Sequence, residues 1–280
     1  MPFMSGSPVL TDQKFNQETQ EARQFGGRSY ESTPYTLGPP PGGTTFDTMT
    51  IGGSITATGV LMVLLVGAAI FGWTQVTQTS PVVDKLGRVI GGPSMPPWIM
   101  FAMIGGVVAG LITSFKPKAA RITAPIYSLL MGTALGAISA VYNHYYDGIV
   151  TQAVFATLGI FVAMLGLYAT RIIKVTNRFV MIVSAATLGI FVMYLLSFVV
   201  GLFGVNVTFL HDPSPLGILI SVGIIIIAAL NLAIDFAFIE KASQHGVPKY
   251  MEWYAGFGVM VTLVWIYLEV LRLLSMLNRR

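Results

Sequence analysis

Two acidic side chains lie inside apolar segments near the carboxyl end of this 280-residue chain. Asp235 stands in LNLAIDFAFIE, with Asn231 four residues before it, and Glu269 stands in WIYLEVLRLL, with Arg272 three residues after it. Residues three or four apart share one face of a helix, so each acid has a polar neighbour on its own face. Carboxylate and amide oxygens suit a hard cation such as Ca2+, and a carboxylate also exchanges protons. These four residues are therefore candidates for an ion or proton site.

A cluster of basic residues, Lys116, Lys118 and Arg121, follows another apolar segment in TSFKPKAAR. We expect this cluster at the same membrane side as Asp235, where a basic side chain could pair with the acid. Two simpler interpretations stay open. Asp235 could extend to the nearby surface, since Glu240 follows only five residues later, and Arg272 could neutralise Glu269 on its own helix.

The composition is that of an integral membrane protein. Hydrophobic residues make up 54% of the chain and charged residues 10%, against roughly 25% charged in an ordinary soluble domain, and the mean hydropathy is +0.72. The net charge of +4 is spread between the apolar runs, which argues against a nucleic-acid-binding protein. The chain has no cysteine, which excludes disulfides and thiol chemistry, and its three histidines lie outside the apolar runs. We expect no cofactor.

Seven apolar runs are long enough to cross a bilayer as helices, which takes about 20 residues because each backbone amide must be satisfied within its own segment. The predicted fold is all-α, a bundle of seven transmembrane helices in residues 51–280. Small residues in the second and third runs allow close helix packing, including Gly105, Gly106 and Gly110 and then Gly132 and Gly136. The predicted runs are 55–73, 97–115, 124–142, 149–170, 180–203, 215–239 and 254–277.

Residues 1–50 differ from the rest of the chain. They are polar and rich in Pro, Gly, Thr and Gln, so we expect a flexible tail, which could dock a cytoplasmic partner. The tail lacks the charged start and apolar core of a secretory signal, so the first apolar helix is expected to insert and remain.

The distribution of Lys and Arg predicts the orientation. Eleven lie on one side of the predicted membrane and four on the other, which places the amino terminus inside and the carboxyl terminus outside. Because two of the four are the last two residues, a final run that enters without crossing fully is an alternative. The eleven are Lys14, Arg23, Arg28, Lys116, Lys118, Arg121, Arg171, Lys174, Arg178, Lys241 and Lys249, and the four are Lys85, Arg88, Arg279 and Arg280.

The closing stretch AIDFAFIEKASQHGVPKYMEWYAGFGVMVTLVWIYLEVLRLLSML resembles the Bax inhibitor-1/YccA family, also called the transmembrane Bax inhibitor motif (TMBIM) family, in its actinobacterial-type branch. The resemblance covers roughly residues 50–280, and YNHYYDGIVTQAVFATLGIFVAMLGLYAT also matches the family pattern. It implies a bundle with a central seventh helix in a bacterial plasma membrane. It also implies a pH-sensitive calcium leak, in which two acids share a proton and a basic residue latches the closed state. The acids fall on Asp235 and Glu269, and the latch falls near Lys118 or Arg121.

Two features depart from that pattern. The second acid is Glu269 rather than Asp, and Arg272 lies beside it. In addition, 34 residues separate the acids, so a hairpin turning at 246–248 would set Asp235 beside about Val259 and leave Glu269 about 15 Å further along the helix. Contact between the acids would need a hairpin that turns nearer Glu252, or a tilted or broken last helix. Gly256 and Gly258 could supply the break.

The leading functional hypothesis is a pH-sensitive channel for Ca2+ as the permeant ion, with Asp235, Glu269 and Asn231 on the pathway. The two acids would form at most a weak Ca2+ site. The alternative is a regulatory protein that binds a membrane protease or another membrane protein. An enzyme is not expected, because the Gly-x-Gly-Asp stretch of intramembrane aspartyl proteases and the common hydrolase and phosphate-binding motifs are missing.

Overall fold

The computed structural model describes residues 47–83, 89–203 and 213–279. Within these residues, seven helices are long and apolar enough to cross a membrane, and each overlaps one predicted run. The all-α polytopic fold is thus confirmed. The helices are α2 (Ile51–Thr74), α3 (Trp98–Phe115), α4 (Ala120–Tyr145, after the short 3-10 helix Pro117–Ala119), α5 (Ile149–Ala169), α6 (Asn177–Leu202), α7 (Pro215–Gln244) and α8 (Met251–Asn278).

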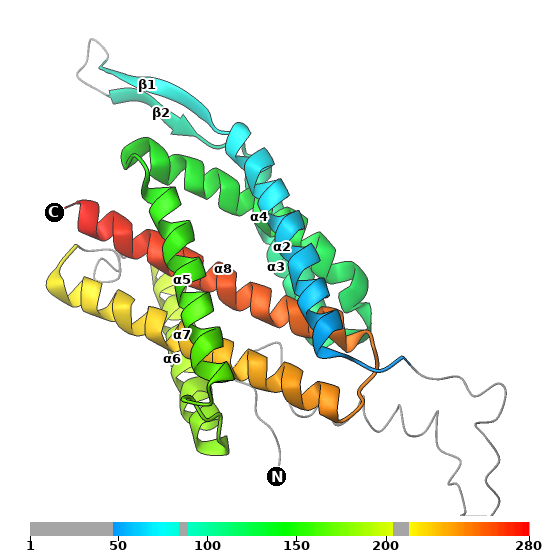
Figure 1. The fold of residues 1–280 in the computed structure, drawn as a ribbon. Helices are drawn as coiled ribbons and strands as arrows, with labels where there is room; N and C mark the ends of the chain where they lie inside the picture. The colour runs from blue at the N-terminus through cyan, green and yellow to red at the C-terminus, as the bar shows by residue number, and fades with distance from the viewer. Residues whose placement is uncertain (1–46, 84–88, 204–212, 280) are drawn as a thin grey trace, which may run out of the picture.

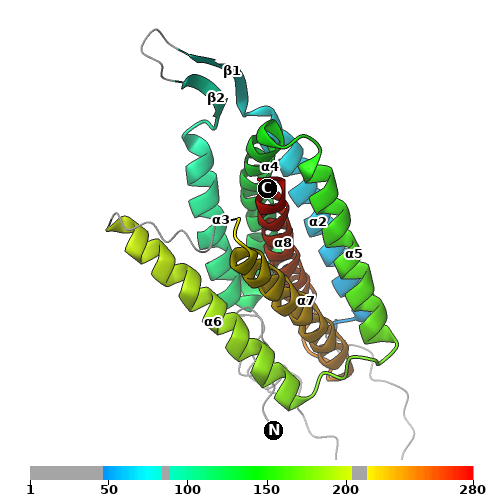
Figure 2. The ribbon, with the colours of Figure 1, turned by 90° about the vertical axis from the view of Figure 1, so that its left-hand side faces the viewer.

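Helix α8 is the centre of the bundle. In an apolar 18-residue stretch of α8, 67% of the residues are buried, whereas the corresponding share is 17% in α2 and 11% in α6. It packs against α2, α4, α5 and α7, which surround it in Figure 2, whereas α6 contacts the bundle mainly through α7. The buried polar residues of α8, which include Thr262, Glu269 and Arg272, are therefore enclosed by other helices rather than by lipid.

A β-hairpin that the sequence did not reveal connects α2 to α3. Strands β1 (Thr77–Val83) and β2 (Val89–Ser94) pair antiparallel, with Thr77 opposite Ser94 and an irregularity between Thr79 and Val82. Two short strands are stabilised mainly by each other, so the segment has no strong local signal. The hairpin extends beyond the helices at one end of the molecule (Figure 1). Lys85 and Arg88 lie outside the described residues.

The bundle has two ends. We call the end next to the β-hairpin the hairpin side, and the end next to the turn between α7 and α8 the turn side. At the hairpin side, Arg279 follows the last residue of α8 and its Nε donates to the Tyr146 hydroxyl, at the end of α4, over 3.0 Å. At the turn side, the start of α2 lies beside the turn between α7 and α8, as Figure 1 shows. Helix α8 has 28 residues, which is long enough to cross between the two sides.

Glycines bring α2 and α4 into close backbone contact. A Cβ atom added at Gly136 would clash with the carbonyl oxygen of Ala69, and one at Gly132 would clash with that of Leu65. Gly72 on α2 is placed in the same way against the carbonyl oxygen of Thr133. The small residues predicted to permit close packing do so here, because lipid leaves van der Waals contact as a main source of helix association.

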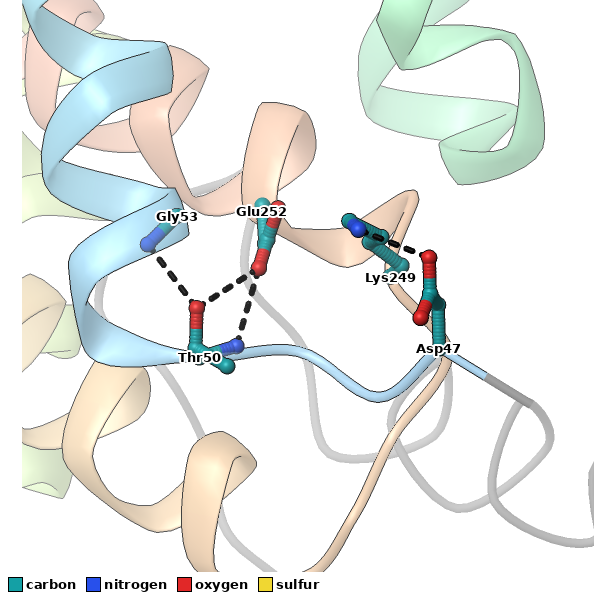
Figure 3. A network of polar contacts seen from close by, with 5 residues as sticks. All are labelled: Asp47, Thr50, Gly53, Lys249 and Glu252. Atoms are coloured by element: carbon teal, nitrogen blue, oxygen red, sulfur yellow. Dashed lines mark hydrogen bonds and ion pairs between the residues drawn. The ribbon is translucent and has the colours of Figure 1, made fainter. Parts of the chain in front are cut away.

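Residues 47–50, which the expected flexible tail included, are part of the folded bundle (Figure 3). The Met49 amide donates to the Val247 carbonyl over 2.7 Å, and the Lys249 ammonium lies 2.7 Å from the Asp47 carboxylate. The Asp47 carboxylate raises the pKa of Lys249 through this hydrogen bond and through charge attraction. We call residues 47–50 the tail root. The rest of the predicted tail, residues 1–46, lies outside the described residues.

The tail root also joins the start of α2 to the start of α8. The Glu252 carboxylate oxygen Oε1 accepts from the Thr50 amide over 2.9 Å and from the Thr50 hydroxyl over 3.0 Å. The Thr50 hydroxyl oxygen in turn accepts from the Gly53 amide, which caps the amino terminus of α2. A carboxylate at this position also complements the positive end of the helix dipole.

Candidate ion and proton site

Asp235 is completely buried between α7 and α8. Its Oδ2 accepts from the Thr262 hydroxyl over 2.7 Å, and its Oδ1 has no hydrogen-bond partner among the described residues. The residue lies nine positions before the end of α7, about 14 Å from the turn side along the helix. The alternative in which Asp235 extends to the surface is therefore not realised. Its neutral or charged state instead has to be accommodated inside the bundle.

Asn231 lies one turn deeper on the same face of α7 and is 2% exposed. Its Nδ2 donates to the Thr187 hydroxyl of α6 over 2.8 Å and to the Ile227 carbonyl over 2.9 Å. Its Oδ1, like the hydroxyl oxygen of Ser184 on α6, is buried and has no partner in the part of the chain that the structure describes. Buried oxygens of this kind are uncommon and often mark a place where water or an ion enters.

Glu269 belongs to a second cluster, between α8, α6 and α7. Its Oε2 lies 2.8 Å from Nη2 of Arg272, and its Oε1 accepts from the Tyr194 hydroxyl of α6. Arg272 also donates to the Tyr194 hydroxyl and lies 3.4 Å from the Ser221 hydroxyl of α7. Both charged residues are under 10% exposed. The local ion pair that was one interpretation of the sequence is thus present, with partners from two further helices.

The two acids do not meet. Asp235 bonds to Thr262, which precedes Glu269 by seven residues, or about 10 Å along α8. Thr262 lies within a turn of Val259, the expected neighbour of Asp235. Because Glu269 lies nine residues before the hairpin-side end of α8, the acids occupy opposite halves of the bundle.

The break that could have brought the acids together is absent, because α8 is one continuous α-helix over Met251–Asn278. Gly256 serves packing instead: a Cβ atom there would lie 2.9 Å from the Thr58 amide nitrogen of α2. The turn between α7 and α8 is at Gly246, as expected. This residue has the left-handed φ of +64° that glycine adopts without strain.

The basic residues considered as a latch lie at the turn side. Lys118 in the 3-10 helix and Arg121 in the first turn of α4 are both exposed. The one hydrogen bond to the Asp235 side chain within the described residues comes from Thr262, so neither base latches it in this structure. The described residues also contain no group of three or more His, Asp or Glu side chains placed to hold a metal ion.

Together these contacts form a row of polar side chains through the apolar interface of α6, α7 and α8. Its turn-side half holds Asp235, and its hairpin-side half holds the Glu269–Arg272 pair. The members found only with the structure are hydroxyl residues, whose presence in an apolar helix is a weak signal because they can bond their own backbone. We call the following residues the polar row: Asp235, Thr262, Asn231, Thr187, Tyr194, Glu269, Arg272 and Ser221.

Comparison with protein families gives one match over nearly the whole chain. A family model described as Bax inhibitor 1 like matches residues 7–279 and so extends into the tail, beyond the roughly 50–280 of the resemblance. Comparison with curated proteins and with solved structures gives no match.

Proposed function

The chain belongs to the Bax inhibitor 1-like family of membrane proteins, and from this premise we propose that it is a pH-sensitive cation leak channel for Ca2+. Protons and Ca2+ would use the polar row between α6, α7 and α8. The turn side, which carries the tail root and most of the basic residues, would face the cytoplasm of a bacterial cell.

The observation that carries this proposal is the environment of Asp235. The carboxyl group is fully buried in a membrane-spanning helix, has one hydroxyl donor, and leaves Oδ1 without a partner among the described residues. A charged side chain at membrane depth costs about 2.5–3.5 kcal/mol on insertion scales, so gain or loss of one proton changes the energy of this interface substantially. We propose that this change opens and closes the path.

The distance between the acids supports different roles for them in this proposal. A carboxylate with one amide neighbour, as at Asp235 and Asn231, offers few oxygens, so a cation would bind weakly there and pass on. The Glu269 carboxylate is already held by Arg272 and Tyr194. We therefore place the proton-sensitive gate at Asp235 alone, and regard the Glu269–Arg272 pair as a separate barrier in the hairpin-side half.

Calcium flux in proteoliposomes at acidic and alkaline pH tests the proposal. The wild type should show flux that changes with pH, and Asp235→Asn, which keeps the shape but cannot ionise, should lose that change. Asp147→Asn, in the exposed loop after α4, is the matched control and should behave as the wild type. Unchanged pH-dependent flux in Asp235→Asn would show that the gate lies elsewhere.

A second role, as a regulator of a membrane protease, is favoured by the tail root. Residues 47–50 bond directly to the turn between α7 and α8, so a partner that binds the tail would act next to the start of α8. Deleting residues 1–45 leaves this root in place. Loss of partner binding with intact flux would assign partner binding to the tail and conduction to the bundle, and retained binding would remove the tail from this role.

A further inference from the structure

A cavity of about 530 Å³ lies between α2, α4, α5 and α8, and none of its lining residues belongs to the polar row. Leu135 and Ser139 of α4 and Tyr267 of α8 line it, and residues of α2 and α5 complete the wall. Its volume falls in the range of roughly 300–1,000 Å³ that is typical of small-molecule sites. The cavity lies in the membrane-spanning part of the chain and is not used by the proposed ion path.

The hydroxyl groups that line the cavity already bond within the protein. The Ser139 and Tyr267 hydroxyl oxygens lie 2.6 Å apart, and Ser139 also bonds to the Leu135 carbonyl oxygen over 2.7 Å. Thr157 donates to the Ala153 carbonyl over 2.8 Å. An occupant therefore finds few groups with which to form hydrogen bonds, and the cavity selects a molecule, or part of one, that is apolar.

The cavity borders the lipid. On its lining, Val66 and Ile70 of α2 are 52% and 64% exposed, and Val154 and Leu158 of α5 are each 42% exposed. At this position in a membrane-spanning bundle the surrounding medium is hydrocarbon, not water. The molecules next to these side chains are therefore lipid acyl chains.

The cavity is also elongated and ends near an interface. Its α2 wall runs from Met62 to Thr74, twelve residues or about 18 Å along the helix, and ends at the last residue of α2 on the hairpin side. Trp73 lines this end, and tryptophan is enriched where acyl chains meet headgroups. A flexible chain with a polar head at one end fits this shape.

We propose that the cavity binds one acyl chain of a phospholipid from the hairpin-side leaflet, with the headgroup beside Trp73 and Thr74. The chain fills the space between α2 and α5 and packs on α4 and α8. It thereby supplies the van der Waals contacts that the cavity walls otherwise lack. The site is independent of the ion path and would exist in a protein that conducts no ions.

Photocrosslinking tests this site. The protein is placed in phosphatidylethanolamine and phosphatidylglycerol vesicles that contain phosphatidylglycerol with a diazirine in the middle of one acyl chain. After irradiation, peptide mass spectrometry should find label on Leu135 and Tyr267, in the cavity wall formed by α4 and α8. Leu135 is 4% exposed and out of reach of lipid that stays on the outer surface.

Two variants should block entry: Val154→Phe from α5 and, independently, Ile70→Phe from α2. The matched control is Val162→Phe, which makes the same change two turns further along α5 at a side chain that is 63% exposed and outside the cavity lining. Label on Leu135 and Tyr267 should fall to background in both blocked variants and persist in the control. Label confined to exposed side chains of α2 and α5, or equal label in all three variants, would overturn the proposal.

A free fatty acid that carries a diazirine serves as a second probe in the same experiment. Label from the fatty acid alone, with none from the phospholipid, would overturn the phospholipid assignment.

Discussion

At the scale of single residues, the two membrane acids differ in how their charge is compensated. Glu269 has a cation and a phenol as partners, and Asp235 has one hydroxyl. Removing one partner of a buried ion pair leaves the other uncompensated, whereas removing both can be nearly neutral. Glu269 is thus part of the structural framework of the bundle, and Asp235 is the better candidate for a group that changes charge during function.

This difference predicts the effect of changing Arg272. Arg272→Met should lower the free energy of unfolding by about 3–5 kcal/mol, because it leaves the buried Glu269 carboxylate without its cation. The double variant Glu269→Gln/Arg272→Met should recover much of that loss, since it removes both charges. Thermal unfolding in detergent measures the stability of the single and the double variant. A double variant as unstable as Arg272→Met alone would show that packing of the arginine, rather than the ion pair, dominates.

At the scale of elements, backbone contact between α2 and α4 depends on glycine. Gly136→Ala would force a methyl group against the Ala69 carbonyl oxygen, and overpacking of this kind costs about 1–3 kcal/mol. We expect a clear drop in unfolding temperature. Gly159→Ala on α5 is the control, because among the described residues no atom beyond its own stretch of helix lies within 4 Å of the added Cβ, and it should be neutral or slightly stabilising. Equal effects of the two changes would contradict the packing role of Gly136.

The tail root provides a second element-scale prediction. Thr50→Ala removes the cap of α2 and one hydrogen bond to Glu252, so it should cost about 0.5–2 kcal/mol of stability. Thr56→Ala is a matched control, because within the described part of the chain the exposed Thr56 hydroxyl bonds only its own helix backbone, at Gly52. Chemical unfolding in detergent compares them. A Thr50→Ala protein as stable as the control would show that the Thr50 hydroxyl stabilises neither the start of α2 nor its contact with Glu252 of α8.

The Lys249–Asp47 pair should contribute less than this cap, because it is an exposed ion pair. Because the pKa of Lys249 is raised, the contribution of the lysine charge persists into alkaline pH and is lost as the pH rises through that raised pKa.

At the scale of the whole molecule, the positions of the loops predict the membrane orientation. The chain has no cysteine, so single cysteines report accessibility without background. Asp147→Cys lies in the exposed hairpin-side loop after α4, and Gln244→Cys lies at the exposed turn-side end of α7. In intact cells, a membrane-impermeant maleimide should label Asp147→Cys directly and Gln244→Cys only after permeabilisation. The reverse pattern would invert the proposed topology.

The sequence predicted the architecture well, and the site only in part. The seven spans and the polar residues Asp235 and Glu269 follow from local hydropathy, and each lies in the helix expected for it. The β-hairpin was missed because short strands depend on their pairing partner. The partners of the acids, Thr262 and Tyr194, were missed because a lone hydroxyl in an apolar helix carries little information.

What the sequence by itself determined is therefore the set of membrane helices and the polar residues within them. A membrane helix must satisfy its backbone hydrogen bonds within its own segment, so the local sequence is enough to predict it. The tertiary structure decided which side chains meet. Close glycine contacts such as Gly136 on Ala69 and Gly256 on Thr58 join segments far apart in the chain and set how the helices are rotated and shifted against one another. The packing of α7 against α8 pairs Asp235 with Thr262 and leaves Glu269 two turns away, with Arg272 as its partner.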